Sequence, residues 1–239
     1  MVEIKNTQVY DLKESVVASG NAMRTQPDPV TDETFKASLE RCKRLAKLGG
    51  GSGHSNFRTG IMVSFDLKYP QYFTKQVQRY HFLQYVASTS MMHCITKMDM
   101  SKCCNKYVSP IEIGLMKEMI ELHQLMSLNR EDAVVFTDLR KDYYTLLMHY
   151  FPQFPETDSE TYEKLCNDST PDQLLYDLYM RIISNCPMGA ELWVHCSTNY
   201  EQLATIWKQR KNHKLKEDWG EFTAWIQSLP YAQDLIICE

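Results

Sequence analysis

The feature that most constrains the fold is the stretch GIMVSFDLKY at positions 60–69. Every second side chain in it is apolar, which is the period of a β-strand with one buried face. The apolar members are Ile61, Val63, Phe65 and Leu67. Pro70 ends the strand, because proline cannot donate to a sheet ladder. Strand-like residues also occupy 3–17, and a short buried strand is expected at 191–196.

Most of the remaining chain is predicted to be helical. Residues 31–48 have apolar positions at helical spacing and basic residues in their later half, and the glycines from Gly49 onward end this helix. Two segments, Ser109-Pro110-Ile111-Glu112 and Thr170-Pro171-Asp172-Gln173, have the pattern of a capping box with proline at the first helical position. The predicted helices cover 31–48, 71–98, 109–128, 130–150, 170–186 and 200–229. This pattern indicates a helix-rich α/β (α+β) protein with few strands.

Composition narrows the class of protein. A chain of 239 residues with 44% hydrophobic residues can bury a core as one large domain. Its net charge of −4 gives no reason to expect nucleic-acid binding. No apolar run approaches the roughly 18 residues of a membrane span, and no basic region followed by an apolar core suggests a secretory signal.

Eight cysteines are scattered without a C-x-x-C pair, which favours reduced thiols in a cytoplasmic protein. A zinc site could use Cys103, Cys104 and a distant histidine, but this spacing matches no common template. We therefore expect no metal.

Polar side chains are dense between Gln76 and His93. As part of a helix, Arg79, Ser90 and His93 would lie on one side of it. Such a run is costly to bury unless a polar ligand satisfies it; a solvated or interhelical face is the alternative. Its polar members are Gln76, Gln78, Arg79, Tyr80, His81, Gln84, Ser88, Thr89, Ser90 and His93.

Two further segments could bind a ligand. The loop Gly51–Phe57 contains glycines whose free N–H groups could hold a phosphate, although it matches neither a Walker A loop nor a dinucleotide-binding fingerprint. It could equally be a plain loop. Thr198–Leu203 leads into a basic segment around Arg210, which is either a binding site or a solvated face. Acidic residues follow at 217–221, which argues against a nucleic-acid helix.

Taken in this order, the three features resemble the flavin-dependent thymidylate synthases. That family has a histidine loop before a strand, then Q-x-x-R-H-R, serines leading to S-x-R, and N-x-R before a helix with an arginine. The corresponding residues are His54, Gln76, Arg79, Tyr80, His81, Ser88, Ser90, Met92, His93, Asn199, Glu201 and Arg210; Gly20–Arg24 also resembles the family's opening. The likeness covers 1–100 and 185–230, so the chain is expected to be one domain, 1–239, with a divergent helical insertion around 99–185.

The resemblance implies a thymidylate synthase-complementing-protein-like fold with a small, mostly antiparallel sheet. It implies a transferase, here a methyltransferase, that converts dUMP to dTMP or makes a related base modification. The cofactor would be FAD, with methylenetetrahydrofolate and NADPH as co-substrates. The protein would be a cytoplasmic homotetramer with sites shared between subunits, bound to a pyrimidine nucleotide and to neither nucleic acid nor membrane.

The resemblance also implies roles for individual residues of this chain. Cofactor-binding positions are His54, Ser55, Arg79, Tyr80, His81 and Asn199. Nucleotide-binding positions are Gln76, Ser88, Ser90, His93 and Arg210. Arg210 and Ser90 would be catalytic, and an arginine at the position of Arg210 polarises the pyrimidine carbonyl in the family, which is an electrostatic role.

The chain departs from the family motifs at four positions. Tyr80 replaces a histidine, whereas His81, Met92 and Glu201 replace arginines. Each lost charge-assisted contact is worth about 1.5–3 kcal/mol. Three functions therefore remain open: a flavin-dependent enzyme, a catalytically altered nucleotide-binding or regulatory protein on the same fold, and a helical scaffold in which the features coincide by chance.

Overall fold

The computed structural model describes residues 1–48, 53–151 and 168–238. The chain forms two compact units, which we call the sheet unit (1–88 with 191–239) and the helical unit (89–190). The helical unit includes the residues 99–185 in which the sequence shows no match to the family. Gly49–Ser52, Pro152, Pro155 and Cys166 lie outside the described residues.

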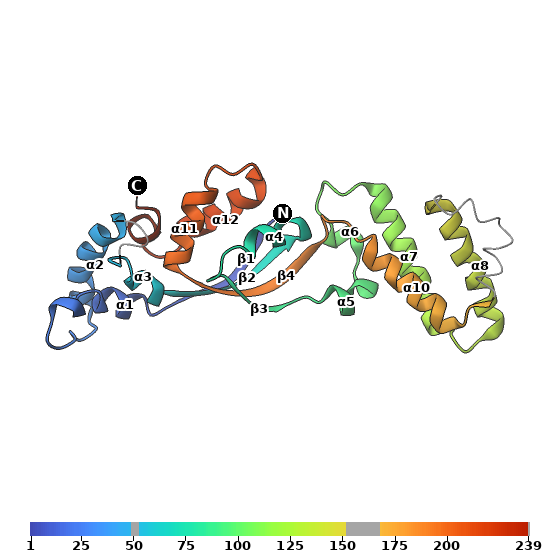
Figure 1. Cartoon of the computed structure of the whole chain (residues 1–239), viewed down its shortest axis with the longest axis horizontal. Coiled ribbons are helices and arrows are strands. Elements are labelled where there is room, and N and C mark those ends of the chain that lie inside the picture. The colour runs from blue at the N-terminus through green and yellow to red at the C-terminus, as the bar shows by residue number, and fades with distance from the viewer. Residues whose placement is uncertain (49–52, 152–167, 239) are drawn as a thin grey trace. The chain divides into compact units, whose positions relative to one another are not determined.

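The sheet unit is built on an antiparallel sheet (Figure 1). Its described strands follow the order β1 (Glu3–Tyr10), β2 (Met62–Pro70), β4 (Glu191–Asn199) and β3 (Gln84–Ser88). The predicted strand at 60–69 is confirmed as β2, and its alternation is seen directly in the burial of every second residue. The predicted strand at 191–196 is confirmed as β4, which pairs with β2 along its whole length.

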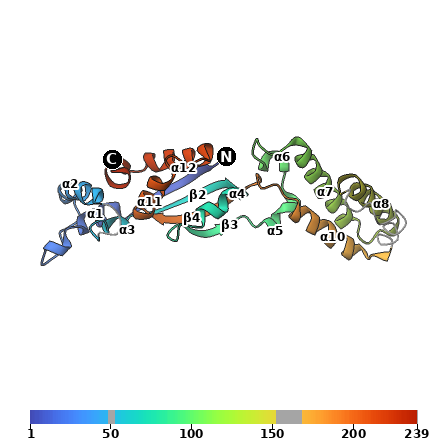
Figure 2. The same ribbon diagram turned by 45° about the horizontal axis from the view of Figure 1, so that its top comes forward.

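Helices α11 and α12 lie on one face of this sheet (Figures 1 and 2). Phe65 of β2 packs between α12 residues, with ring centroids 4.3 Å from Trp225 and 6.2 Å from Phe222. The described helical segments of the sheet unit are α1 (Leu12–Ala18), η1 (Asn21–Met23), α2 (Asp32–Lys47), α3 (Phe57–Gly60), α4 (Gln71–Val77), α11 (Tyr200–Arg210), α12 (Lys216–Ser228) and η3 (Gln233–Ile237). The helix predicted at 31–48 is confirmed as α2, which begins at a capping box on Thr31.

Two helix predictions are wrong. The segment 71–98 is not one helix, because α4 ends at Val77 and residues 84–88 form strand β3 at the sheet edge. Pairing with β4 supplies hydrogen bonds that a sequence pattern does not show, so tertiary context overrides local preference. The helical stripe that joined Arg79, Ser90 and His93 therefore does not exist. The predicted helix at 200–229 is also divided, between Arg210 and Lys216.

The helical unit has its own core. Its described helices are α5 (Met91–Cys94), η2 (Ile95–Lys97), α6 (Met100–Cys103), α7 (Pro110–Leu128), α8 (Ala133–Tyr150) and α10 (Pro171–Ser184). The capping boxes at Ser109 and Thr170 are confirmed, because each hydroxyl accepts from the backbone three residues later and each third side chain returns the bond. Methionine and leucine side chains of α7, α8 and α10 fill this core, and the methionines contribute adaptable volume.

These observations confirm the predicted fold class: a helix-rich α/β protein with a small antiparallel sheet. Within the described ranges, no helix is both long and apolar enough to cross a membrane. The same ranges contain no group of three or more histidine, cysteine or acidic residues arranged to hold a metal ion.

Candidate functional site

A cavity of about 490 Å³ opens in the sheet unit where the segment after α4 meets α11. Its size falls within the roughly 300–1,000 Å³ typical of small-molecule sites. The lining consists of Thr59, Arg79, Tyr80, His81, Phe82, Asn199, Glu201, Gln202, Thr205, Gln209 and Arg210. The fold thus brings together five residues that the resemblance implies for a site, from parts of the sequence more than 100 residues apart. We call this the Arg210 cavity.

Arg210 is held in a fixed orientation at the end of α11. Its Nε donates to the hydroxyl of Tyr80 at 2.5 Å, and its guanidinium lies 4.7 Å from the ring centroid of Trp219. The Tyr80 hydroxyl in turn donates to Oε1 of Gln209 at 3.1 Å. Tyr80 is 5% exposed and Trp219 is 1% exposed. A cation stacked on a buried aromatic ring gains about 0.5–2 kcal/mol, so this guanidinium is preorganised.

Gln76 contacts Trp219, the residue on which Arg210 stacks. The indole Nε1 of Trp219 donates to Oε1 of Gln76 at 3.0 Å, and Gln76 is not part of the cavity lining. The resemblance implies that Gln76 contacts a nucleotide. The structure shows it in contact with the indole on which Arg210 stacks.

His213 contacts the same indole. Its ring lies 6.0 Å from that of Trp219, and its Nδ1 accepts from the backbone N–H of Leu215 at 3.1 Å. Burial, followed by the positive charges of Arg210 and Lys214, lowers the pKa of His213. The neutral ring is therefore favoured beside Arg210, and a further positive charge is avoided at this point.

Asn199 and Gln202 anchor the other side of the cavity. Oδ1 of Asn199 accepts from the backbone N–H of Gln202 at 2.9 Å, which caps α11. Oε1 of Gln202 accepts from the backbone N–H of Phe82 at 3.2 Å and so ties the segment after α4 to α11. Asn199 was predicted as a site residue. Gln202, Gln209 and Phe82 were not, because nothing in the local sequence links 82 to 202.

Glu201 brings a carboxylate into the lining. The resemblance implies an arginine of an N-x-R motif at this position. Its Oε2 lies 3.5 Å from Nη1 of Arg58, a residue of α3 that is 3% exposed. A buried arginine from a different element thus partners the carboxylate that replaces the motif arginine, and Arg58 was not predicted from the sequence.

His54 and Ser55 lie apart from the Arg210 cavity lining. His54 is exposed and lines a neighbouring cavity of about 440 Å³, while Thr59 lines both cavities. Ser55 is buried, and its backbone carbonyl accepts from the N–H of Arg58 at 2.9 Å at the start of α3. Of the predicted glycine loop, Gly53 has a left-handed backbone with φ of 75°, which glycine adopts without strain. Gly51 and Ser52 lie outside the described residues.

The remaining predicted residues do not line this cavity. Ser88 is exposed at the end of β3, opposite Val194. Ser90 and His93 belong to the helical unit, where Ser90 is the N-cap of α5 and its carbonyl accepts from the backbone of His93 at 3.2 Å. The structure therefore groups Arg79, Tyr80, His81, Asn199 and Arg210, and leaves the serines outside this group.

A scan of protein-family models finds no match to this chain. A search of curated protein sequences also finds none. Among solved structures, the chain is similar to Helicobacter pylori flavin-dependent thymidylate synthase ThyX complexed with FAD and dUMP, with a TM-score of 0.54 and 13% identity over 99% of this chain and 97% of that chain. A second structure of the same enzyme with FAD and dUMP gives a TM-score of 0.50, 12% identity and the same coverage. At these identities the similarity establishes the fold.

Proposed function

We propose that this chain binds a pyrimidine deoxynucleotide at the Arg210 cavity, binds FAD beside it, and catalyses reductive methylation of the base, from dUMP to dTMP or a closely related modification. The observation that carries this proposal is the fixed guanidinium of Arg210 in a cavity that Arg79 and His81 also line. The solved proteins of the same fold are complexed with FAD and dUMP, which supports the choice of ligands.

The residues of the cavity fit these ligands chemically. Two guanidinium groups suit a phosphate or a polarised carbonyl, because they donate charge-assisted hydrogen bonds in a planar fork. Amide side chains at 199, 202 and 209 add neutral donors and acceptors of the kind that uracil and isoalloxazine edges require. The volume of about 490 Å³ accommodates a mononucleotide.

In this proposal Arg210 binds the pyrimidine carbonyl and stabilises negative charge that develops on the ring. The bond from Nε to Tyr80 and the stacking on Trp219 fix the direction of its two Nη groups before ligand binds. Arg79, Tyr80, His81 and Asn199 hold the flavin, together with His54 and Ser55. When bound, FAD supplies a hydride, with methylenetetrahydrofolate as the carbon donor and NADPH as the source of electrons.

Flavin uptake and nucleotide binding test the proposal. Purified protein incubated with FAD and desalted should show the visible flavin absorption bands, and dUMP should raise its melting temperature. Arg210→Ala should weaken dUMP binding about 10- to 100-fold, because a charge-assisted contact worth about 1.5–3 kcal/mol is lost. Arg44→Ala, at an exposed position of α2, is the matched control and should bind as the wild type does. A colourless protein that takes up no flavin would refute the enzyme function.

A second candidate is a catalytically altered nucleotide-binding or regulatory protein on the same fold. The Glu201 carboxylate at the cavity favours it, because the resemblance implies an arginine at this position, and loss of that charge-assisted contact weakens the binding of the flavin. This candidate predicts a dUMP-induced rise in melting temperature without flavin uptake and without dTMP formation. Formation of dTMP from dUMP in the presence of all co-substrates would exclude it.

The proposed enzyme is a homotetramer with sites shared between subunits. Light scattering during gel filtration measures its mass directly. A mass near that of one chain, 28.0 kDa, would contradict a shared site.

A further inference from the structure

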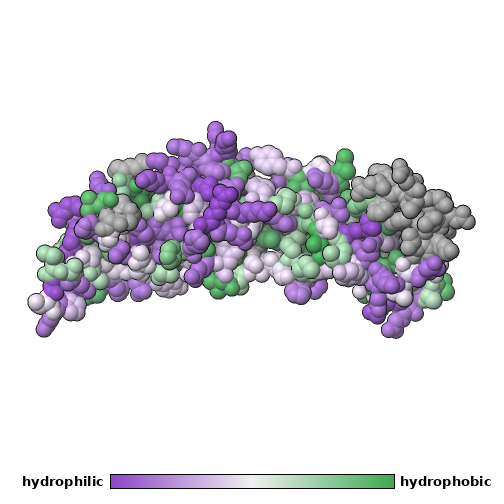
Figure 3. All heavy atoms as spheres, in the orientation of Figure 1, coloured by the Kyte–Doolittle hydropathy of each residue, from purple (hydrophilic) through white to green (hydrophobic). Residues whose placement is uncertain are grey.

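A second cavity, of about 280 Å³, lies in the sheet unit beside α11, and its lining also includes residues of the end of α2, of helix α3 and of the C-terminal η3. Its lining includes four cationic side chains and one carboxylate: Lys47, Arg58, Lys208, Lys211 and Glu201. Figure 3 shows hydrophilic side chains gathered over α11 and α12. We call this the Arg58 cavity. Its excess of positive charge favours an anionic occupant.

Arg58 is the most buried of these cations. Its Nη2 donates to the backbone carbonyl of Ala46 and lies 3.4 Å from Sγ of Cys238, while Nη1 lies 3.5 Å from Glu201. Its Nε has no hydrogen-bond partner in the described part of the chain, although the residue is 3% exposed. Buried donors are almost always satisfied, so an unmatched guanidinium N–H on a cavity points to a ligand that accepts from it.

Trp207 provides a second such donor on the same cavity. Its indole Nε1 is buried and finds no acceptor among the described residues. An indole N–H can only donate, so the group that satisfies it must be an acceptor. Two lysines of the lining, Lys47 and Lys208, also have no ion-pair partner within 4.0 Å among residues 1–48, 53–151 and 168–238. The cavity also has one unsatisfied acceptor, Oε2 of Glu201, so unsatisfied donors and positive charges still exceed the acceptors among the described lining residues.

We propose that the Arg58 cavity binds a small phosphate-bearing anion. A phosphate group has several acceptor oxygens and about two negative charges near neutral pH, which match two unsatisfied N–H donors and the surplus cations. The volume lies just below the roughly 300–1,000 Å³ of drug-sized ligand sites, which favours a phosphomonoester or a pyrophosphate over a dinucleotide. Glu201 and Thr205 line both this cavity and the Arg210 cavity, so a ligand here contacts the wall that the two share.

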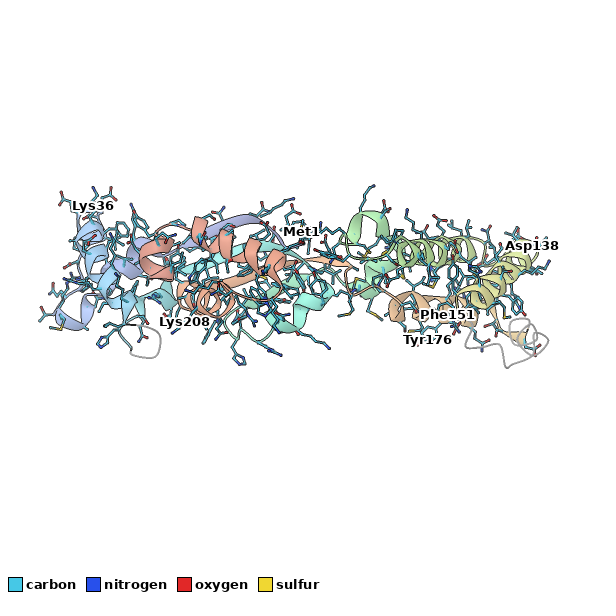
Figure 4. All side chains as sticks on the ribbon, turned by 90° about the horizontal axis from the view of Figure 1, so that it is seen from above. Met1, Lys36, Asp138, Phe151, Tyr176 and Lys208 are labelled. Carbon is cyan, nitrogen blue, oxygen red and sulfur yellow. The ribbon has the colours of Figure 1, made fainter. Side chains whose placement is uncertain are left out.

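Inorganic pyrophosphate is a suitable probe for the full chain. We expect it to raise the melting temperature saturably and to change tryptophan fluorescence. Lys208→Gln and Lys47→Gln should each weaken binding about tenfold, because each removes one charge-assisted contact. Lys36→Gln is the matched control: Lys36 is an exposed residue of α2, and Figure 4 shows it well separated from Lys208. This control should bind as the wild type does.

Trp207→Phe keeps most of the ring but removes the N–H, so it should weaken binding and abolish most of the fluorescence change. Arg210→Ala should leave pyrophosphate binding intact, which separates this site from the proposed nucleotide site. The proposal is overturned if sodium chloride at equal ionic strength reproduces the shift, or if Lys208→Gln and Trp207→Phe both bind as the wild type does. It is also overturned if Arg210→Ala alone removes binding, because the probe would then occupy the Arg210 cavity.

Discussion

Replacing Gln76 by alanine tests how the structure fixes Arg210. The Gln76 side chain is the acceptor for Trp219 Nε1, and Trp219 is 1% exposed, so water cannot readily replace the lost partner. A buried donor left without a partner costs about 1–3 kcal/mol. For a chain of this length each kcal/mol lowers the melting temperature by about 2–4 °C. We therefore expect Gln76→Ala to melt about 2–12 °C below the wild type.

Thermal and urea unfolding of the full chain without ligand measure this effect. Gln76→Glu keeps an acceptor at the same place and should be destabilised less than Gln76→Ala. Gln78→Ala alters an exposed glutamine two residues later and should change the free energy of unfolding by no more than about 0.5 kcal/mol. If Gln76→Ala unfolds as the wild type does and only the dUMP-induced rise is smaller, Gln76 contacts the nucleotide and the positioning role is refuted.

Three further changes probe other parts of the molecule. Asn199→Ala should destabilise the protein by about 0.5–2 kcal/mol in urea unfolding, because α11 loses its cap on Gln202, whereas Asn199→Asp keeps the acceptor and should be nearly neutral. Burial raises the pKa of the Cys196 thiol to about 12, so iodoacetamide at pH 8 should label Cys196 only on unfolding; rapid labelling of the folded protein would contradict its burial. Burial lowers the pKa of His123 in the folded protein. The contribution of this histidine to the free energy of unfolding is therefore present above its unfolded pKa near 6.5 and is lost as the pH falls through the lower folded value. His123→Gln should therefore lose less stability than the wild type between pH 7 and 5, and equal losses would show that another group controls this range.

Local sequence signals predicted the elements that depend mainly on local interactions. The capping boxes at Ser109 and Thr170 place the starts of α7 and α10, since both partners of each box lie within four residues. The alternation at 60–69 identifies β2, because the period of 2 is a property of the strand itself. Proline 70 marks the point where β2 passes into α4.

Elements that depend on distant partners were missed or misassigned. β3 pairs with β4, which lies more than 100 residues further along the chain, and an edge strand of five residues has too short a pattern to be distinguished from a helix. The break between α11 and α12 was also missed, although the contacts seen there are local and join His213 to Leu215 and Trp219, two and six residues further along the chain.

The sequence by itself determined the helix-rich α/β class, the capped helices and strand β2, and it predicted a site at Arg79, Tyr80, His81, Asn199 and Arg210. Tertiary structure alone decided how those positions act, because hydrogen bonds and stacking depend on distance in space rather than on spacing along the chain. It stacked Arg210 on Trp219, and it placed Gln76 where its side chain accepts a hydrogen bond from that indole. It also brought Glu201 within 3.5 Å of the buried Arg58, an ion pair across 143 residues that no local pattern predicts, since it forms only when α3 and α11 meet.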